Sequence, residues 1–186
     1  MVGSSRTVAA ERLLGVRHTI LDVSDSPIEE LTIVADGDAV VGTYFPGHWV
    51  KPAQDDFGPR VDAASDDVLG SATTQFVEYF RGDRTHFELT VKTHGDPLSE
   101  RVWDHLVTIA YGQTTTYGAI ARALGNPNMA QAVGGSVGHN PISIVIPCHR
   151  VIGADGSLTG YAGGLDRKRF LLDLEEPAEA KAARLF

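Results

Sequence analysis

The segment 143–153 constrains this chain more than any other, because it joins a run of β-branched apolar residues to the only cysteine. The apolar run predicts a buried strand, which Pro147 ends. The thiol of Cys148 follows, and the imidazole of His149 and the guanidinium of Arg150 come directly after it. A strand that stops at this point would deliver a nucleophile to a surface.

Two interpretations of Cys148 are open on these residues alone. A lone cysteine is most often a small buried hydrophobic residue with no chemical role. Neighbouring cationic or hydrogen-bonding groups, however, lower the pKa of a thiol and populate the reactive thiolate. His149 and Arg150 supply such groups, but adjacency in the sequence does not decide between the two interpretations.

The composition indicates a globular chain. Its 186 residues are 42% hydrophobic and 22% charged, enough to bury a core in one domain or two small ones. No long apolar run and no basic-then-apolar leader occurs, so we expect no membrane contact and a cytoplasmic protein. One cysteine and scattered histidines predict no internal disulfide and no metal site.

The charge is unevenly distributed. The formal net charge of −8 argues against binding of nucleic acid through overall charge. Residues 1–94 carry 8 Lys or Arg against 15 Asp or Glu, whereas residues 95–186 carry 8 against 9. Within 113–170 five basic residues stand against two acidic ones, a net of +3. This segment is where we expect a polyanion to bind.

The first half of the chain predicts a small sheet with one helix. Residues 1–16 lack an apolar period, and we expect them to be flexible. Asp36-Gly37 favours a tight hairpin, Ser71 predicts a helix start, and Gly82 predicts its end. The expected strands are 18–23, 31–35, 39–45 and 87–91, with a loop over 47–67.

The second half predicts mainly helices, from a junction near residue 94. Asp96 and Pro97 open a helix that continues to about Ala110, with an apolar face at intervals of four. Thr116 and Asn128 are expected to cap two short helices around a glycine-bearing turn, which suggests a helix-turn-helix. The last helix is expected over 166–175, its basic triplet 167–169 solvated, and 177–186 as a loose tail.

Two stretches are unusually rich in glycine. Each interior glycine of a helix costs about 1 kcal/mol relative to alanine, so Gly134 and Gly135 call for an explanation. They can allow close packing of helices within the protein, or close approach of the helix to the sugars and phosphates of a DNA groove. The segment 160–164 predicts a flexible wall over the thiol that fits around a planar ligand.

Several motifs together resemble the O6-alkylguanine-DNA alkyltransferase family. They are Arg101-Val102-Trp103, Tyr111-Gly112, Thr116-Tyr117-Gly118, Gly138-His139-Asn140-Pro141, Ile144 to Gly153 with Pro147-Cys148-His149-Arg150, and Gly160-Tyr161-Ala162-Gly163-Gly164. The match runs almost unbroken from about 98 to 175, and such a joint pattern is highly specific. Over 18–92 the resemblance is weaker and rests mainly on Ser26-Pro27-Ile28.

The resemblance implies an α+β protein: a small N-terminal α/β domain (1–94) with an antiparallel sheet, then a mainly helical, winged-helix-like domain (95–186) for DNA binding and alkyl transfer. It implies DNA repair in which Cys148 irreversibly takes the alkyl group from O6 of a flipped-out guanine, or from O4-alkylthymine. No cofactor and no metal are needed. The implied partner is double-stranded DNA with an alkylated guanine, bound by a monomer that can cluster on DNA.

Roles carry over from the family to matching residues. His149 would activate Cys148 through a water, Glu175 would orient His149, Asn140 would brace the active-site turn, and Tyr117 would donate its hydroxyl to the leaving guanine. A carboxylate, an imidazole and a thiol in series repeat the orienter, base and nucleophile of cysteine enzymes. The expected contacts to substrate or DNA are Tyr161, Ala162, Gly163, Gln131, Gly134, Gly135 and Arg150.

Gln131 is the largest departure from the family pattern, which usually has an intercalating arginine there. Glutamine brings no charge to the DNA backbone, so we expect slower repair or weaker binding than in a typical member. Smaller departures are Leu98-Ser99 for Phe-Gln, Ala110 for a usual proline, and Ala162 where some members have serine.

Two other functions are compatible with parts of the sequence. Related alkyltransferase-like proteins sense alkylated DNA without catalysis, but they lack the cysteine that this chain has. A cysteine hydrolase would use Cys148 and His149, yet its histidine is usually distant in sequence and the helix-turn-helix would be unexplained. Transfer of one methyl group to Cys148 distinguishes the three.

Overall fold

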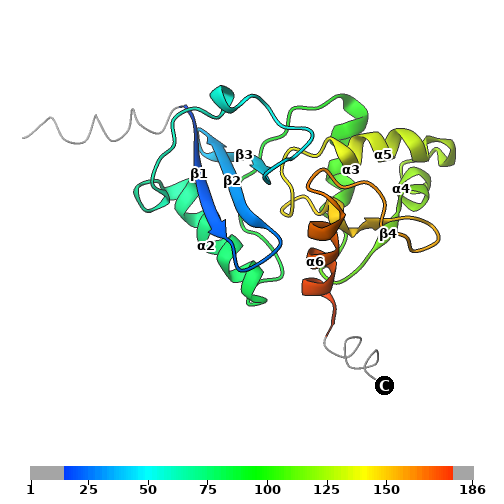
Figure 1. The fold of residues 1–186 in the computed structure, drawn as a ribbon. Helices are drawn as coiled ribbons and strands as arrows, with labels where there is room; N and C mark the ends of the chain where they lie inside the picture. Colours follow the sequence, from blue (N-terminus) through cyan, green and yellow to red (C-terminus); the bar gives the residue numbers. More distant parts are fainter. Residues whose placement is uncertain (1–14, 178–186) are drawn as a thin grey trace, which may run out of the picture.

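The structure is a computed structural model that describes residues 15–177 (Figure 1). A three-stranded sheet with helix α2 forms one side of the molecule, and helices α3, α4, α5 and α6 form the other. The α+β class expected from the sequence is confirmed. Of the segments expected to be flexible, residues 1–14 and 178–186 lie outside the described residues.

The sheet is an antiparallel meander of β1 (Val16–Val23), β2 (Glu29–Asp36) and β3 (Ala39–Tyr44). The first three predicted strands are therefore confirmed. Gly37 lies in the tight turn between β2 and β3 with φ of +57°, a conformation that glycine adopts without strain. One face of the sheet buries Leu31, Ile33 and Val40 in the core that α2 covers.

The N-cap of helix α2 (Asp67–Arg81) lies five positions before the predicted cap at Ser71. Asp66, not Ser71, is the N-cap, because its carboxylate accepts hydrogen bonds from the backbone N–H groups of Val68 and Leu69. Gly82 ends the helix in the left-handed conformation, as predicted. The helix turns Phe76 and Tyr79 into the core, and both are fully buried.

The strand predicted over 87–91 is wrong. Within this segment only Val91 forms an isolated bridge, to Val40 of β3. The side chain of Gln75 on α2 explains the difference, because it accepts from the N–H of Glu88 at 2.7 Å and donates to its carbonyl at 3.1 Å. A side chain thus satisfies the backbone groups that a neighbouring strand would otherwise pair.

The helical half consists of α3 (Pro97–Leu106), β4 (Thr115–Thr116), α4 (Tyr117–Ala123), α5 (Ala130–Gly138), β5 (Val151–Ile152) and α6 (Leu165–Glu175). Asp96 and Thr116 cap α3 and α4 as predicted. The helix predicted to reach Ala110 ends at Leu106. The predicted cap at Asn128 is wrong, because Asn126 caps the single 3₁₀ turn that leads into α5.

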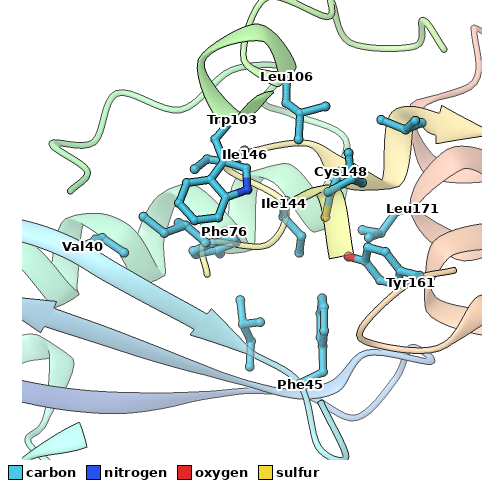
Figure 2. Packing of buried hydrophobic residues seen from close by; sticks show 14 of the residues in the cluster. Val40, Phe45, Phe76, Trp103, Leu106, Ile144, Ile146, Cys148, Tyr161 and Leu171 are labelled. Carbon is cyan, nitrogen blue, oxygen red and sulfur yellow. The ribbon is translucent and has the colours of Figure 1, made fainter. Parts of the chain in front are cut away.

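Helices α4 and α5 are consecutive and are joined by a short connection, as expected of a helix-turn-helix (Figure 1). The indole of Trp103 on α3 donates to the carbonyl of Ser136 on α5 at 2.8 Å, which fixes α5 on the core. Buried apolar residues of both halves form one cluster (Figure 2). The domain boundary near residue 94 stays a prediction. None of the helices within 15–177 has the length and apolar character needed to cross a membrane.

Candidate active site

The strand predicted before Cys148 is wrong: residues 142–146 form a tight turn. The N–H of Ile146 donates to the carbonyl of Ile142 at 2.9 Å, and Ile144 has φ of +74°, in the left-handed region. Thr43 of β3 donates its hydroxyl to the carbonyl of Ser143 at 2.7 Å. This rigid turn leads into the 3₁₀ helix η4 (Cys148–Arg150), which begins at the thiol.

Asn140 holds this turn at both ends. Its side-chain N–H donates to the carbonyl of Ile146 at 2.7 Å, while its side-chain oxygen accepts from the N–H of Ile142 at 3.0 Å. The side chain is 2% exposed, so water does not compete for these hydrogen bonds. The geometry is that of a brace, the role implied for Asn140 by the family resemblance.

His149 and Glu175 form a buried pair, with Nε2 of the imidazole 2.8 Å from Oε1 of the carboxylate. Both side chains are inaccessible to solvent. Nδ1 of His149 is buried and has no hydrogen-bond partner among the described residues. If Nε2 carries the proton that Glu175 accepts, Nδ1 presents its lone pair and is available as a base.

Arg150 does not lie at a surface that DNA can contact, contrary to the expectation from sequence. It is buried, and its Nε and Nη2 atoms each lie 2.8 Å from an oxygen of Glu175 in a bidentate ion pair. A third hydrogen bond joins Nη1 to the carbonyl of Ile109. The guanidinium of Arg150 and the imidazole of His149 therefore both donate to a single carboxylate.

The protonation states of this pair follow from burial and hydrogen bonding. Burial alone would raise the pKa of Glu175, but the hydrogen bonds from His149 and Arg150 hold that pKa well below its ordinary value. Burial lowers the pKa of His149, against the opposing effect of Glu175. The site thus holds an ionised carboxylate beside a neutral imidazole at neutral pH.

Cys148 is 5% exposed, and burial raises the pKa of its thiol. The side chain of Asn140 and the ammonium of Lys168 act in the opposite direction by favouring the thiolate. The resting cysteine is therefore a thiol that needs a base in order to react. Adjacent cations alone do not activate Cys148, because the effect of burial on its pKa is larger.

Lys168 is fully buried, although the basic triplet 167–169 was expected to be solvated. Its ammonium donates to the carbonyls of Val151 at 2.7 Å and Thr159 at 2.6 Å. Burial lowers the pKa of Lys168 to about 8. The expectation is also wrong for Arg167, which donates to the carbonyls of Pro27, Pro46 and Gly163 and contacts Glu29. Arg169 is exposed, as expected.

The segment 160–164 lies against the thiol. Tyr161 is buried and tilted against Phe45, and Figure 2 shows its hydroxyl on the side that faces the sulfur of Cys148. That hydroxyl has no hydrogen-bond partner among the described residues. A Cβ atom on Gly163 would lie 2.4 Å from the Phe45 ring, so glycine is required there. Ala162, beside them, is partly exposed.

Tyr117, the first residue of α4, is joined to the segment over the thiol by a 3.2 Å hydrogen bond from Thr159 to its hydroxyl. A Cβ on Gly134 would lie 3.6 Å from the Tyr117 ring, whereas one on Gly135 would meet nothing within 4 Å. Packing within the protein therefore does not explain Gly135, which is exposed on α5 together with Gln131.

The structure brings Cys148, His149, Glu175 and Asn140 together, and it connects Tyr117 and Tyr161 to the same region through the loop. Two further polar residues were not found from the sequence. Tyr79 donates a 2.6 Å hydrogen bond to Glu175, and Lys168 anchors the carbonyls around the site. Each lies on the buried face of a helix and binds a partner elsewhere in the chain, so no local pattern predicts the contact.

The chain is similar to known proteins. The family model "6-O-methylguanine DNA methyltransferase, DNA binding domain" matches residues 97–177. The methylated-DNA–protein-cysteine methyltransferase of Mycobacterium tuberculosis is 42% identical over 162 residues, 87% of this chain and 95% of the relative. That of Haemophilus influenzae is 38% identical over 81% of this chain and 83% of the relative.

A solved structure shows that the fold is similar as well. The crystal structure of Mycobacterium tuberculosis OGT in complex with DNA superimposes with a TM-score of 0.76 at 41% identity. The superposition covers 87% of this chain and 93% of that chain. The similarity therefore includes the sheet-containing half as well as the helical half, where the sequence resemblance is stronger.

Proposed function

The chain belongs to the family of methylated-DNA–protein-cysteine methyltransferases, and from this premise we propose that Cys148 is the residue that accepts the alkyl group. The activity is repair of DNA by direct transfer of an alkyl group to the protein. The observation that carries the assignment is the buried pair of His149 and Glu175 directly after Cys148, in which Nδ1 of His149 has no partner among the described residues and is left to accept a proton.

In the proposed reaction, Nδ1 of His149 takes the thiol proton of Cys148, through a water as in the family. The sulfur then attacks the alkyl carbon, an S–C bond forms, and the bond between that carbon and O6 of guanine breaks. The electron pair of the broken bond stays with guanine, which takes a proton from the hydroxyl of Tyr117. Tyr117 then regains a proton from water, and His149 returns its extra proton to water. Because the thioether is stable, each molecule reacts once.

Because the thiol is buried, the reaction depends on His149 as a general base and on Glu175 as its partner. A thiol whose pKa is raised by burial is not a nucleophile at neutral pH until its proton is removed. Glu175 fixes the imidazole by its hydrogen bond to Nε2 and stabilises the imidazolium that forms. Asn140 holds the turn, so the sulfur is fixed for an in-line attack.

The proposed substrate is an alkylated guanine that has rotated out of duplex DNA, since a base within the stack does not reach a buried thiol. The segment from Tyr161 to Gly163 would enclose the base. The exposed face of α5, with Gln131 and Gly135, would contact the DNA, and Gly135 leaves the backbone open to a groove. We propose that the protein acts as a monomer.

Incubation of the full chain with duplex DNA that contains O6-methylguanine tests this function. We expect the peptide with Cys148 to gain the mass of one methyl group, once per molecule. The Cys148→Ser variant serves as the control: it should bind the same DNA and gain no mass. Binding without mass gain by the natural chain would identify a sensor, and repeated turnover of an ester or peptide would identify a hydrolase; either result contradicts the proposal.

A further inference from the structure

The carboxylate of Glu175 accepts hydrogen bonds from the sheet-containing half of the molecule as well as from its own, helical half. The hydroxyl of Tyr79, on α2, donates to Oε1 of Glu175 at 2.6 Å, across 96 positions of sequence. The side chain of Tyr79 is fully buried. Its ring packs edge-on against Phe80 and Tyr111, which fixes the direction in which the hydroxyl points.

Tyr79 and His149 donate to the same oxygen. Oε1 of Glu175 accepts from the Tyr79 hydroxyl, from Nε2 of His149 at 2.8 Å and from Nη2 of Arg150 at 2.8 Å. Oε2 accepts from Nε of Arg150 at 2.8 Å and from the N–H of Gly112 at 3.3 Å. Each donor takes up part of the negative charge, so each weakens the hold of Glu175 on a proton of His149.

We propose that Tyr79 is a positioning residue for the alkyl transfer, because its hydroxyl withdraws charge from Oε1 of Glu175 and so keeps the imidazole of His149 neutral and able to accept the thiol proton. The inference rests on the proposed function of Cys148 and His149. It assigns a chemical role to α2, an element outside the segment 97–177 that the family's DNA-binding model matches.

The other charged and titratable groups around the pair do not replace the hydroxyl of Tyr79 at Oε1. Arg150 and Lys168 are cations that also disfavour protonation of His149, but Arg150 is already engaged at both oxygens of Glu175 and Lys168 is bound to backbone carbonyls. Tyr111 donates to the carbonyl of Leu174 rather than to the carboxylate. Within residues 15–177, loss of the Tyr79 hydroxyl therefore leaves Oε1 with His149 and Arg150 as its side-chain donors.

The Tyr79→Phe variant tests the proposal, since it removes one oxygen and keeps the ring. The rate of methyl transfer from duplex DNA would be measured against pH for the full chain. Without the hydroxyl, Glu175 attracts the proton of His149 more strongly, so the acid limb of the profile should move up by about half a pH unit or more. On that limb the rate should fall roughly threefold.

Alkylation of Cys148 by iodoacetamide, followed over the same pH range, gives a second readout that needs no DNA. Failure of the natural chain to accept methyl groups, together with a shifted iodoacetamide profile in Tyr79→Phe, would disprove the proposed function and leave the role of Tyr79 standing. The matched control is Tyr44→Phe, the same change at a buried tyrosine of β3 that contacts Phe57 and His48. Its profile should equal that of the natural chain.

A third variant keeps the test decisive if Tyr79→Phe does not fold. Replacement of Tyr79 by 3-fluorotyrosine leaves the shape almost unchanged and makes the hydroxyl a stronger donor. The acid limb should then move down, opposite to the phenylalanine variant, a result that a purely structural role does not produce. The proposal would be overturned if a folded variant, either Tyr79→Phe or the 3-fluorotyrosine form, had the same acid limb as the natural chain.

Discussion

Nε2 of His149 lies 2.8 Å from Oε1 of Glu175, although 26 residues separate them in the chain. Helix α6 ends at Glu175 and η4 contains His149, so the pair forms only when the helix packs against the turn. Because both side chains are buried, the carboxylate can orient the imidazole without competition from water.

The Glu175→Gln variant should lose transfer activity by about 10²-fold or more, because the imidazole loses the carboxylate that orients it and stabilises its charged form. It should also lose roughly 3 to 5 kcal/mol of stability, since Arg150 becomes a buried charge without its partner. Single-turnover kinetics and urea unfolding measure the two effects. The control is Asp173→Asn, an exposed carboxylate of the same helix; equal losses in both variants would contradict the expectation.

The Asn140→Ala variant should be less stable by roughly 2 to 4 kcal/mol, because the carbonyl of Ile146 and the N–H of Ile142 each lose a buried partner. Methyl transfer should slow as well, since the turn that precedes Cys148 is no longer fixed. Denaturant unfolding and transfer rates on DNA check this prediction. Asn128→Ala, at an exposed position before α5, should change neither quantity.

His48 should make the protein less stable in mild acid. Both of its ring nitrogens are buried without a partner among the described residues, and burial, with Lys51 and Arg167 nearby, lowers its pKa to about 4. The unfolded chain binds the proton near pH 6.5 and the folded chain only near pH 4. Stability attributable to His48 is therefore complete above about pH 6.5 and decreases as the pH falls through this window.

In thermal melts between pH 7 and pH 4, this loss should amount to roughly 2 to 3 kcal/mol. His48→Phe should remove that part of the pH dependence, because the ring already stacks on Phe45 and a phenyl group cannot be protonated. Identical pH dependence in the variant and the natural chain would show that His48 does not titrate on unfolding.

The Gln131→Arg variant should bind duplex DNA more tightly or repair it faster, because arginine adds a charge near the phosphates and a larger side chain to replace the flipped base. Gln131 is exposed on α5, so the change should not affect stability. Fluorescence anisotropy at two salt concentrations and single-turnover rates measure the outcome. Asn128→Arg adds the same charge just before the helix and separates a general charge effect from replacement of the base.

The sequence by itself determined the local elements and the motif. Hairpin turn residues and alternating apolar residues were enough for β1 to β3, and Asp96 and Thr116 capped their helices as expected, because these features depend on neighbours in the chain. The motif around Cys148 was likewise sufficient to indicate the family. Predictions failed where a distant side chain replaced a local partner, as Gln75 does for the segment 87–91.

Only the tertiary structure decided the electrostatics of the site. Arg150 and Lys168 are hydrophilic residues that the sequence assigned to a surface, and Tyr79 had no assigned role. Each is buried because elements far apart in the chain meet and exclude water, and each is then compensated by Glu175 or by backbone carbonyls. Periodicity and motifs do not reveal such partners. The free-energy cost of burying a charge is offset by a contact that forms only in the folded molecule.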